Sequence, residues 1–199
     1  MILKRPKIIA VEGIDGSGKT TLVKRLKDSL EERGFTVKAL KMKGHTADIA
    51  GFFTEKRMNY ENQYMKLSAL MFDLMVRNRE LEESLDCDYV IFDRYTDSLS
   101  VYFDSLSVFI PWVDEIKKCI YEPYLVILLD CSVDIALERL NRREESLKEL
   151  ENRDYLTQVK ERYLQHAGAG YLVINADLST DDIFDLVIKR INDLGRDCL

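Results

Sequence analysis

Short apolar runs alternate with longer segments of helical periodicity along this chain. Apolar runs of this length are typical of strands that are buried on both faces of a parallel sheet. Five of them can be read from the sequence: residues 8–11, 35–40, 89–92, 124–129 and 171–174. The pattern therefore predicts a five-stranded parallel sheet.

The segments between these runs show the spacing of amphipathic helices. Leu22, Leu26 and Leu30 recur every four residues, and we expect Gly34 to end that helix. Residues 64–85 also carry apolar side chains on one side, and a last helix is expected to begin at the capping residues 179–182. Strands that alternate with helices predict an α/β fold with helices on both faces of the sheet. In such folds, ligands bind beyond the carboxyl ends of the strands.

A phosphate-binding loop follows the first expected strand directly. Its eight residues match the pattern GxxxxGK[ST] in full. Glycines let backbone N–H groups surround a phosphate, and the next helix adds the positive end of its dipole. We expect Lys19 to reach the β- and γ-phosphates and the Thr20 hydroxyl to bind Mg²⁺. The expected ATP-binding residues are Gly13, Ile14, Asp15, Gly16, Ser17, Gly18, Lys19, Thr20 and Thr21.

Charge and cysteine usage exclude several other classes of protein. The net charge of −6 argues against a general role in coating nucleic acid, which favours a basic surface. No apolar run approaches the roughly 20 residues that a membrane helix needs. The four cysteines form no CxxC pair, which is typical of reduced thiols in the cytosol. We therefore expect a cytoplasmic protein that binds neither nucleic acid nor a membrane.

A carboxylate and a guanidinium follow the third apolar run. Asp93 could hold Mg²⁺ or orient the attacking phosphate, and the planar fork of Arg94 suits a phosphate. An ordinary ion pair at the end of a strand is the alternative. The phosphate loop alone is shared by GTPases, motor ATPases and small-molecule kinases. The sequence has no Asn-Lys-x-Asp guanine reader, and a translocating ATPase would usually need a longer chain.

The residues around these motifs resemble the thymidylate kinase family. Residues 12–21 are similar to its phosphate loop, and Asp93-Arg94-Tyr95 with Ser98 and Tyr102 is similar to its Asp-Arg-Tyr motif. Residues 137–143 and 155–163 resemble its lid and the helix behind the lid. The resemblance spans nearly the whole chain. It implies a three-layer P-loop kinase fold, as one domain over residues 1–199 with a small lid at about residues 139–153.

The resemblance also implies an activity and a set of site residues. The activity is transfer of the γ-phosphate of ATP to dTMP with Mg²⁺, by a homodimer that could pack through the helix at residues 64–74, although that helix could equally be core. Arg94 would hold the acceptor phosphate, and Asp15 would contact the deoxyribose 3′-hydroxyl. Tyr102 belongs to the same acceptor side. Phe72 would stack on the base and Arg77 would donate to it, unless Phe72 belongs to the core.

The lid is expected to supply the catalytic arginine. Family members place this arginine either in the phosphate loop or in the lid, and this loop carries Gly16 at the position concerned. Arg142 or Arg143 would then stabilise the charge of the moving phosphate. The alternative is a solvated helix in which neighbouring glutamates pair with these arginines.

Three departures from the family pattern affect the acceptor side. Residues 42–46 read Met-Lys-Gly-His-Thr instead of Glu-Pro-Gly-Gly-Thr, and the family's next arginine could be replaced by Lys41, Lys43 or Arg57. Tyr-Phe at residues 102–103 replaces Tyr-Gln, and Arg77 lies one residue further from Phe72 than expected. An acceptor other than dTMP, either another monophosphate or a deoxynucleoside, therefore stays open. So does a nucleotide-binding regulatory module without turnover.

Overall fold

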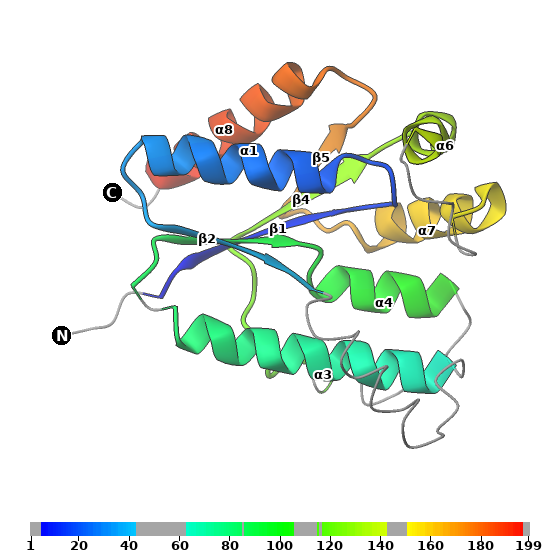
Figure 1. Ribbon diagram of the computed structural model, residues 1–199, viewed down its shortest axis with the longest axis horizontal. Helices are drawn as coiled ribbons and strands as arrows, with labels where there is room; N and C mark the ends of the chain where they lie inside the picture. Colours follow the sequence, from blue (N-terminus) through cyan, green and yellow to red (C-terminus); the bar gives the residue numbers. More distant parts are fainter. Residues whose placement is uncertain are drawn as a thin grey trace.

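The computed structural model describes residues 5–42, 63–84, 86–105, 115, 117–142 and 151–196. Its centre is one parallel sheet of five strands in the order β2-β3-β1-β4-β5 (Figure 1). The strands are β1 (Lys7–Gly13), β2 (Val37–Lys41), β3 (Tyr89–Asp93), β4 (Leu125–Asp130) and β5 (Tyr171–Asn175). All five strands lie where the apolar runs predicted them, so the predicted α/β fold with a five-stranded parallel sheet is confirmed.

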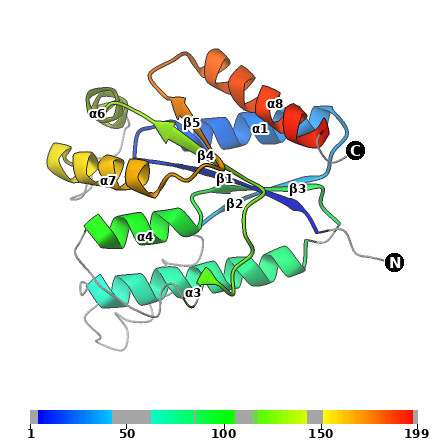
Figure 2. The ribbon, with the colours of Figure 1, turned by 180° about the vertical axis from the view of Figure 1, so that it is seen from behind.

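Helices cover both faces of this sheet and form a three-layer structure (Figures 1 and 2). The helices α1 (Lys19–Glu32) and α8 (Thr180–Arg196) lie on one face. On the other face lie α3 (Gln63–Glu82), α4 (Thr96–Ser105) and α7 (Arg153–His166), and α6 (Val133–Asn141) lies beside α7 beyond the end of β4. Among the described residues, no helix is both long and apolar enough to cross a membrane.

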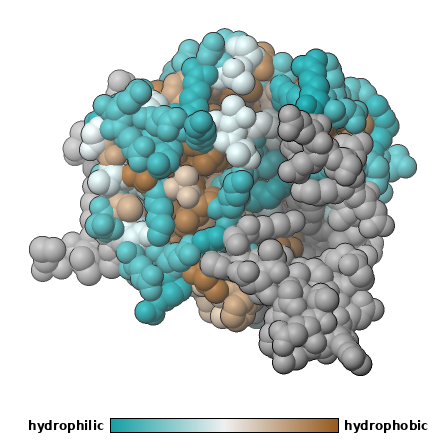
Figure 3. All heavy atoms as spheres, viewed as in Figure 1, coloured by the Kyte–Doolittle hydropathy of each residue, from teal (hydrophilic) through white to brown (hydrophobic). Residues whose placement is uncertain are grey.

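The apolar run of the central strand β1 is continuous because both faces of this strand are buried. Ile9 and Val11 belong to one apolar core, together with the predicted leucine repeat of α1. Ile8 and Ala10 belong to the other core, under α3 and α4. Side chains alternate between the two faces of a strand, so both faces of β1 need apolar residues. Figure 3 shows mostly hydrophilic residues in the upper part of the visible face, as expected for the outer sides of amphipathic helices.

Local signals set the ends of several helices. Gly34 adopts φ +88° after α1, and its N–H donates to Glu31 O at 2.9 Å, which ends the helix where predicted. At the start of α8, the Asp182 N–H donates to Ser179 Oγ at 3.1 Å, which confirms the predicted cap. Ser132 and Asn152 cap α6 and α7 in the same way. Of the expected lid at residues 139–153, residues 143–150 lie outside the described part of the chain.

Candidate active site

The phosphate loop connects β1 to α1 at the carboxyl edge of the sheet. Gly16 is required there for two reasons. Its φ is +83°, a region that L side chains rarely adopt, and a Cβ atom would lie 2.4 Å from the carbonyl oxygen of Ala136 in α6. The loop therefore packs directly against the backbone of α6.

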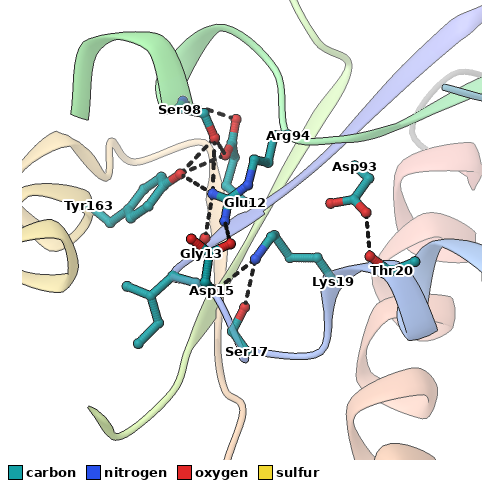
Figure 4. A network of polar contacts seen from close by, with 11 residues as sticks. Glu12, Gly13, Asp15, Ser17, Lys19, Thr20, Asp93, Arg94, Ser98 and Tyr163 are labelled. Atoms are coloured by element: carbon teal, nitrogen blue, oxygen red, sulfur yellow. Dashed lines mark hydrogen bonds and ion pairs between the residues drawn. The ribbon is translucent and has the colours of Figure 1, made fainter. Parts of the chain in front are cut away.

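Lys19 points into the concave side of this loop (Figure 4). Its Nζ donates to the backbone oxygen of Ile14 at 2.6 Å and to Ser17 Oγ at 3.4 Å. Burial of the ammonium, and secondly the charge of Arg94, lower the pKa of Lys19 to about 7. Among the described residues, its hydrogen bonds go to these two neutral oxygens, so the buried ammonium is well placed to receive an anion.

Thr20 and Asp93 meet on the other side of the loop, although they are 73 residues apart in the chain. The Thr20 hydroxyl at the start of α1 donates to Asp93 Oδ2 at 2.5 Å. The contact forms because β3, which ends in Asp93, pairs with β1, which leads into the loop. The structure thus brings together the two side chains that the sequence predicted as Mg²⁺ ligands.

Arg94 directs its guanidinium back over the phosphate loop. Nη1 donates to the carbonyl oxygen of Gly13 at 2.8 Å, and Nη2 forms an ion pair with Asp15 Oδ1 at 2.6 Å. The side chain is buried, and the residue has a positive φ of 69°. The predicted phosphate ligand and the predicted sugar ligand are therefore direct neighbours.

The buried side chain of Glu12 lies next to Arg94 and was not predicted as a site residue. It contacts Ser98 in α4 and Tyr163 in α7, and Arg94 contacts the same two hydroxyls (Figure 4). The available signal in the sequence was a glutamate that directly follows an apolar strand and precedes the loop. Its partners are 86 and 151 residues away, which no local pattern reveals.

The phosphate loop, Asp93 and Arg94 border a cavity of about 670 Å³. Its lining includes the loop residues 15–21 together with Lys41, Asp93, Arg94 and Arg139. Arg139 donates through Nη2 to Ala176 O at 3.1 Å, so its guanidinium is fixed at the cavity wall. The cavity is therefore lined both by the loop and by four charged side chains from other elements. Lys41 lies at the end of β2, Asp93 and Arg94 lie at the end of β3, and Arg139 lies in α6.

Several predicted residues lie elsewhere or are not described. Among the described residues, neither Phe72 nor Arg77 lines the cavity. Phe72 is 58% exposed on α3, and Arg77 donates to Lys41 O at 3.0 Å and pairs with Glu80. Arg142 is exposed and pairs with Glu138. Tyr102 lies within α4, but its side chain, like Arg143, Lys43 and Arg57, is outside the described part.

Comparisons with known proteins agree with this geometry. A sequence model of the family described as thymidylate kinase matches residues 11–187. A probable thymidylate kinase of Metallosphaera sedula is 34% identical over 189 residues, covering 94% of this chain and 93% of that protein. A probable thymidylate kinase of Archaeoglobus fulgidus is 32% identical over 192 residues, covering 92% and 94%. A probable thymidylate kinase 1 of Saccharolobus solfataricus is 29% identical, covering 93% and 96%.

Proposed function

This chain belongs to the thymidylate kinase family, and we propose that it transfers the γ-phosphate of ATP to dTMP, giving ADP and dTDP for dTTP synthesis. One observation carries the proposal. The phosphate loop, the Thr20–Asp93 pair and Arg94 all border the same cavity of about 670 Å³. This arrangement supports binding of a donor polyphosphate and an acceptor phosphate within reach of each other.

The loop side of the cavity would bind ATP. The backbone N–H groups of residues 13–18 and the start of α1 favour the phosphates, and Lys19 would exchange its contacts with Ile14 and Ser17 for contacts with phosphate oxygens. Phosphoryl transfer leaves little covalent work for the protein, so neutralising charge on the moving group is its main task. Lys19 would do this in the loop, and Arg142 or Arg143 would do it from a lid at about residues 139–153.

Arg94 would receive the phosphate of dTMP. Its planar guanidinium offers a forked pair of donors, and the Asp15 ion pair and the Gly13 carbonyl hold it at the edge of the loop. An oxygen of the dTMP phosphate then attacks the γ-phosphorus, and ADP leaves. Asp15 would accept from the deoxyribose 3′-hydroxyl. Phe72, Arg77 and Tyr102 are proposed for the base side on the family resemblance alone.

Thr20 and Asp93 suit a bound Mg²⁺. Both present oxygen atoms, and Mg²⁺ is usually held by one or two protein oxygens together with substrate phosphates and water. The described residues include no cluster of three or more His, Cys, Asp or Glu side chains that could hold a metal. When bound, Mg²⁺ would neutralise phosphate charge during the transfer.

We also propose a single kinase domain over residues 1–199, acting as a homodimer in the cytoplasm on small-molecule nucleotides and not on nucleic acid. Free thiols at Cys87, Cys119 and Cys131 support a reducing compartment. The exposed side chain of Met75 on α3 supports packing of that helix against a second copy.

The test is ADP release with ATP and Mg²⁺ in the presence of each candidate acceptor. The panel contains dTMP, dUMP, dCMP, dGMP, dAMP and UMP, together with thymidine and deoxycytidine. We expect the highest kcat/KM with dTMP. Turnover with a different acceptor only would change the substrate and keep the kinase. Binding of ATP without turnover on any acceptor would favour a regulatory module and refute the enzyme.

A further inference from the structure

The carboxylate of Glu12 is fully buried between β1 and α4, and four donors surround it. Oε1 accepts from the backbone N–H groups of Tyr95 at 2.7 Å and Ser98 at 3.3 Å. Oε2 accepts from Ser98 Oγ at 2.6 Å and from Tyr163 Oη at 3.0 Å. A buried carboxylate is tolerated only when its oxygens are satisfied in this way, so the site is built around this one group.

The two hydroxyl groups connect Glu12 to the guanidinium of Arg94. Nη1 of Arg94 donates to Tyr163 Oη at 3.1 Å and to Ser98 Oγ at 3.4 Å. Ser98 Oγ and Tyr163 Oη also lie 2.7 Å apart, so one of these hydroxyls can donate to the other. An ionised carboxylate can only accept hydrogen bonds, so a hydroxyl that donates to Glu12 leaves its lone pairs for Arg94. The carboxylate therefore sets the direction of the hydrogen bonds that hold the guanidinium.

Glu12 also holds the backbone at Arg94. This residue has a left-handed φ of 69°, a conformation that a side chain other than glycine adopts only when its surroundings enforce it. The N–H of Arg94 donates to Val11 O at 3.0 Å, and the N–H of the next residue, Tyr95, donates to Glu12 Oε1. Two neighbouring residues of β1 thus fix the turn on both sides of the Arg94 α-carbon.

We propose that Glu12 is a positioning residue for acceptor binding, which holds the backbone and the guanidinium of Arg94 in the orientation that receives the acceptor phosphate. This inference rests on the proposed function, because Arg94 is there assigned to the phosphate of dTMP. Glu12 does not touch the substrate itself.

The direct test is Glu12→Gln. Glutamine keeps the size of the side chain and the oxygen that accepts from the two backbone N–H groups, but its NH₂ group donates toward the two hydroxyls. Neither hydroxyl can then donate to this NH₂ group, so their protons turn toward each other or toward Arg94. We expect the KM for dTMP to rise about tenfold or more, as for loss of a hydrogen bond to a charged group, while the KM for ATP changes less than about twofold. Calorimetry should show weaker binding of dTMP but unchanged binding of thymidine, which lacks the phosphate.

A matched pair of tyrosine variants separates positioning from stability. Tyr163 and Tyr171 each donate to a carboxylate near the start of α4, and the acceptor for Tyr171 is Asp97 Oδ2 at 2.6 Å. In the contacts of the described residues, the Tyr163 hydroxyl also accepts from Arg94, whereas the Tyr171 hydroxyl is bonded to Asp97. Tyr163→Phe should raise the KM for dTMP, and Tyr171→Phe should leave it within about twofold of wild type. If Glu12→Gln fails to fold, this pair still tests whether the hydroxyl that links Glu12 to Arg94 serves dTMP binding.

The outcomes distinguish this inference from the proposed function. If wild-type protein does not phosphorylate dTMP, the proposed function fails. If wild type is active but Glu12→Gln folds with an unchanged KM for dTMP, the positioning role is refuted. Equal rises in the KM for both substrates, or equal effects of Tyr163→Phe and Tyr171→Phe, would also refute it. A rise confined to dTMP and to the variants linked to Arg94 supports it.

Discussion

Replacing Lys19 by methionine should make the ligand-free protein more stable while abolishing phosphoryl transfer. The ammonium of Lys19 is buried, and this burial is the main reason that its pKa falls from 10.5 to about 7. At about 1.4 kcal/mol per pKa unit, the fall corresponds to a penalty of roughly 5 kcal/mol for keeping the ammonium charged in the folded state. Methionine fills similar space without a charge.

Lost hydrogen bonds offset part of this gain. Nζ of Lys19 donates to the backbone oxygen of Ile14 and to Ser17 Oγ, and each such bond contributes about 1 kcal/mol to stability. A buried carbonyl left without its donor can cost more than that. We therefore expect Lys19→Met to raise the free energy of unfolding by roughly 1–3 kcal/mol at pH 7.

The gain should depend on pH with a defined sign. The folded-state pKa of Lys19 is depressed, so between about pH 7 and pH 10.5 the unfolded chain carries a proton on Lys19 that the folded protein has released. The unfolding free energy of wild type therefore rises with pH over this window because of Lys19. The advantage of the methionine variant is nearly full at pH 7 and shrinks as the pH approaches 10.

Urea unfolding of ligand-free protein at pH 7 and at pH 9.5 checks both the size of the stability gain of Lys19→Met and the direction in which it changes with pH. Lys27→Met is the control, because Lys27 is partly exposed on the same helix and pairs with Glu31 at 3.3 Å. This control should change stability by less than about 0.5 kcal/mol. A Lys19→Met variant that is less stable than wild type at pH 7, or whose gain does not fall with pH, would refute the reasoning. Saturating ATP with Mg²⁺ should restore the advantage of wild type.

Three further predictions concern the loop and the acceptor side. Gly16→Ala should lose at least about 2 kcal/mol more stability in urea unfolding than Gly18→Ala, because both positions have positive φ but only the first would meet the backbone of Ala136. Arg94→Lys should raise the KM for dTMP about tenfold or more and barely change the KM for ATP, since an ammonium cannot form the forked contact; equal changes in both would contradict this. Phe72→Ala should change the unfolding free energy by less than about 0.5 kcal/mol, because the side chain is 58% exposed, and should raise the KM for dTMP; an unchanged KM would remove Phe72 from the acceptor site.

The strands could be read from the sequence because each contains a short apolar run, and the three central strands β3, β1 and β4 are buried. β1 and β3 each contain four consecutive apolar residues, at 8–11 and 89–92, and this composition distinguishes them from the helices that follow. The order of the strands could not be read, because it depends on which of several similar apolar strands pair. α7 was expected only from the family resemblance, since its buried residues Tyr155, Leu156, Val159 and Tyr163 lie among many charged ones.

The candidate site was predictable where its residues are consecutive. The loop that contains Lys19 and Thr20 has a fixed spacing, and the structure places it at the end of β1 as expected. The contacts of Asp93 with Thr20 and of Arg94 with Asp15 span 73 and 79 residues, so they follow from the pairing of β1 with β3 and not from any motif. Tyr95 and Ser98, which donate to Glu12, follow β3 and so depend on the same pairing, whereas Tyr163 comes from α7.

The arginines at the end of α6 could not be assigned to the cavity from the sequence alone. Arg139 and Arg142 are three residues apart, which in a continuous helix would put them on one face, but α6 ends at Asn141 and Arg142 is its C-terminal cap. Arg139 lines the cavity, whereas Arg142 pairs with Glu138 one turn earlier. Pairing of Arg142 with a neighbouring glutamate was one of the two alternatives left open by the sequence, and no role was predicted for Arg139.

The central position of β1 has a consequence for synthesis of the chain. This apolar strand is made first, yet its hydrogen-bonding partners are β3 at residues 89–93 and β4 at residues 125–130. Until β4 has left the ribosome, at least one edge of β1 lacks its native partner. The phosphate loop then follows a strand that is not yet held in the sheet. The nascent chain therefore carries β1 without a native partner at least until β3 has been made, and such an unpaired, aggregation-prone strand is a target for shielding by a chaperone.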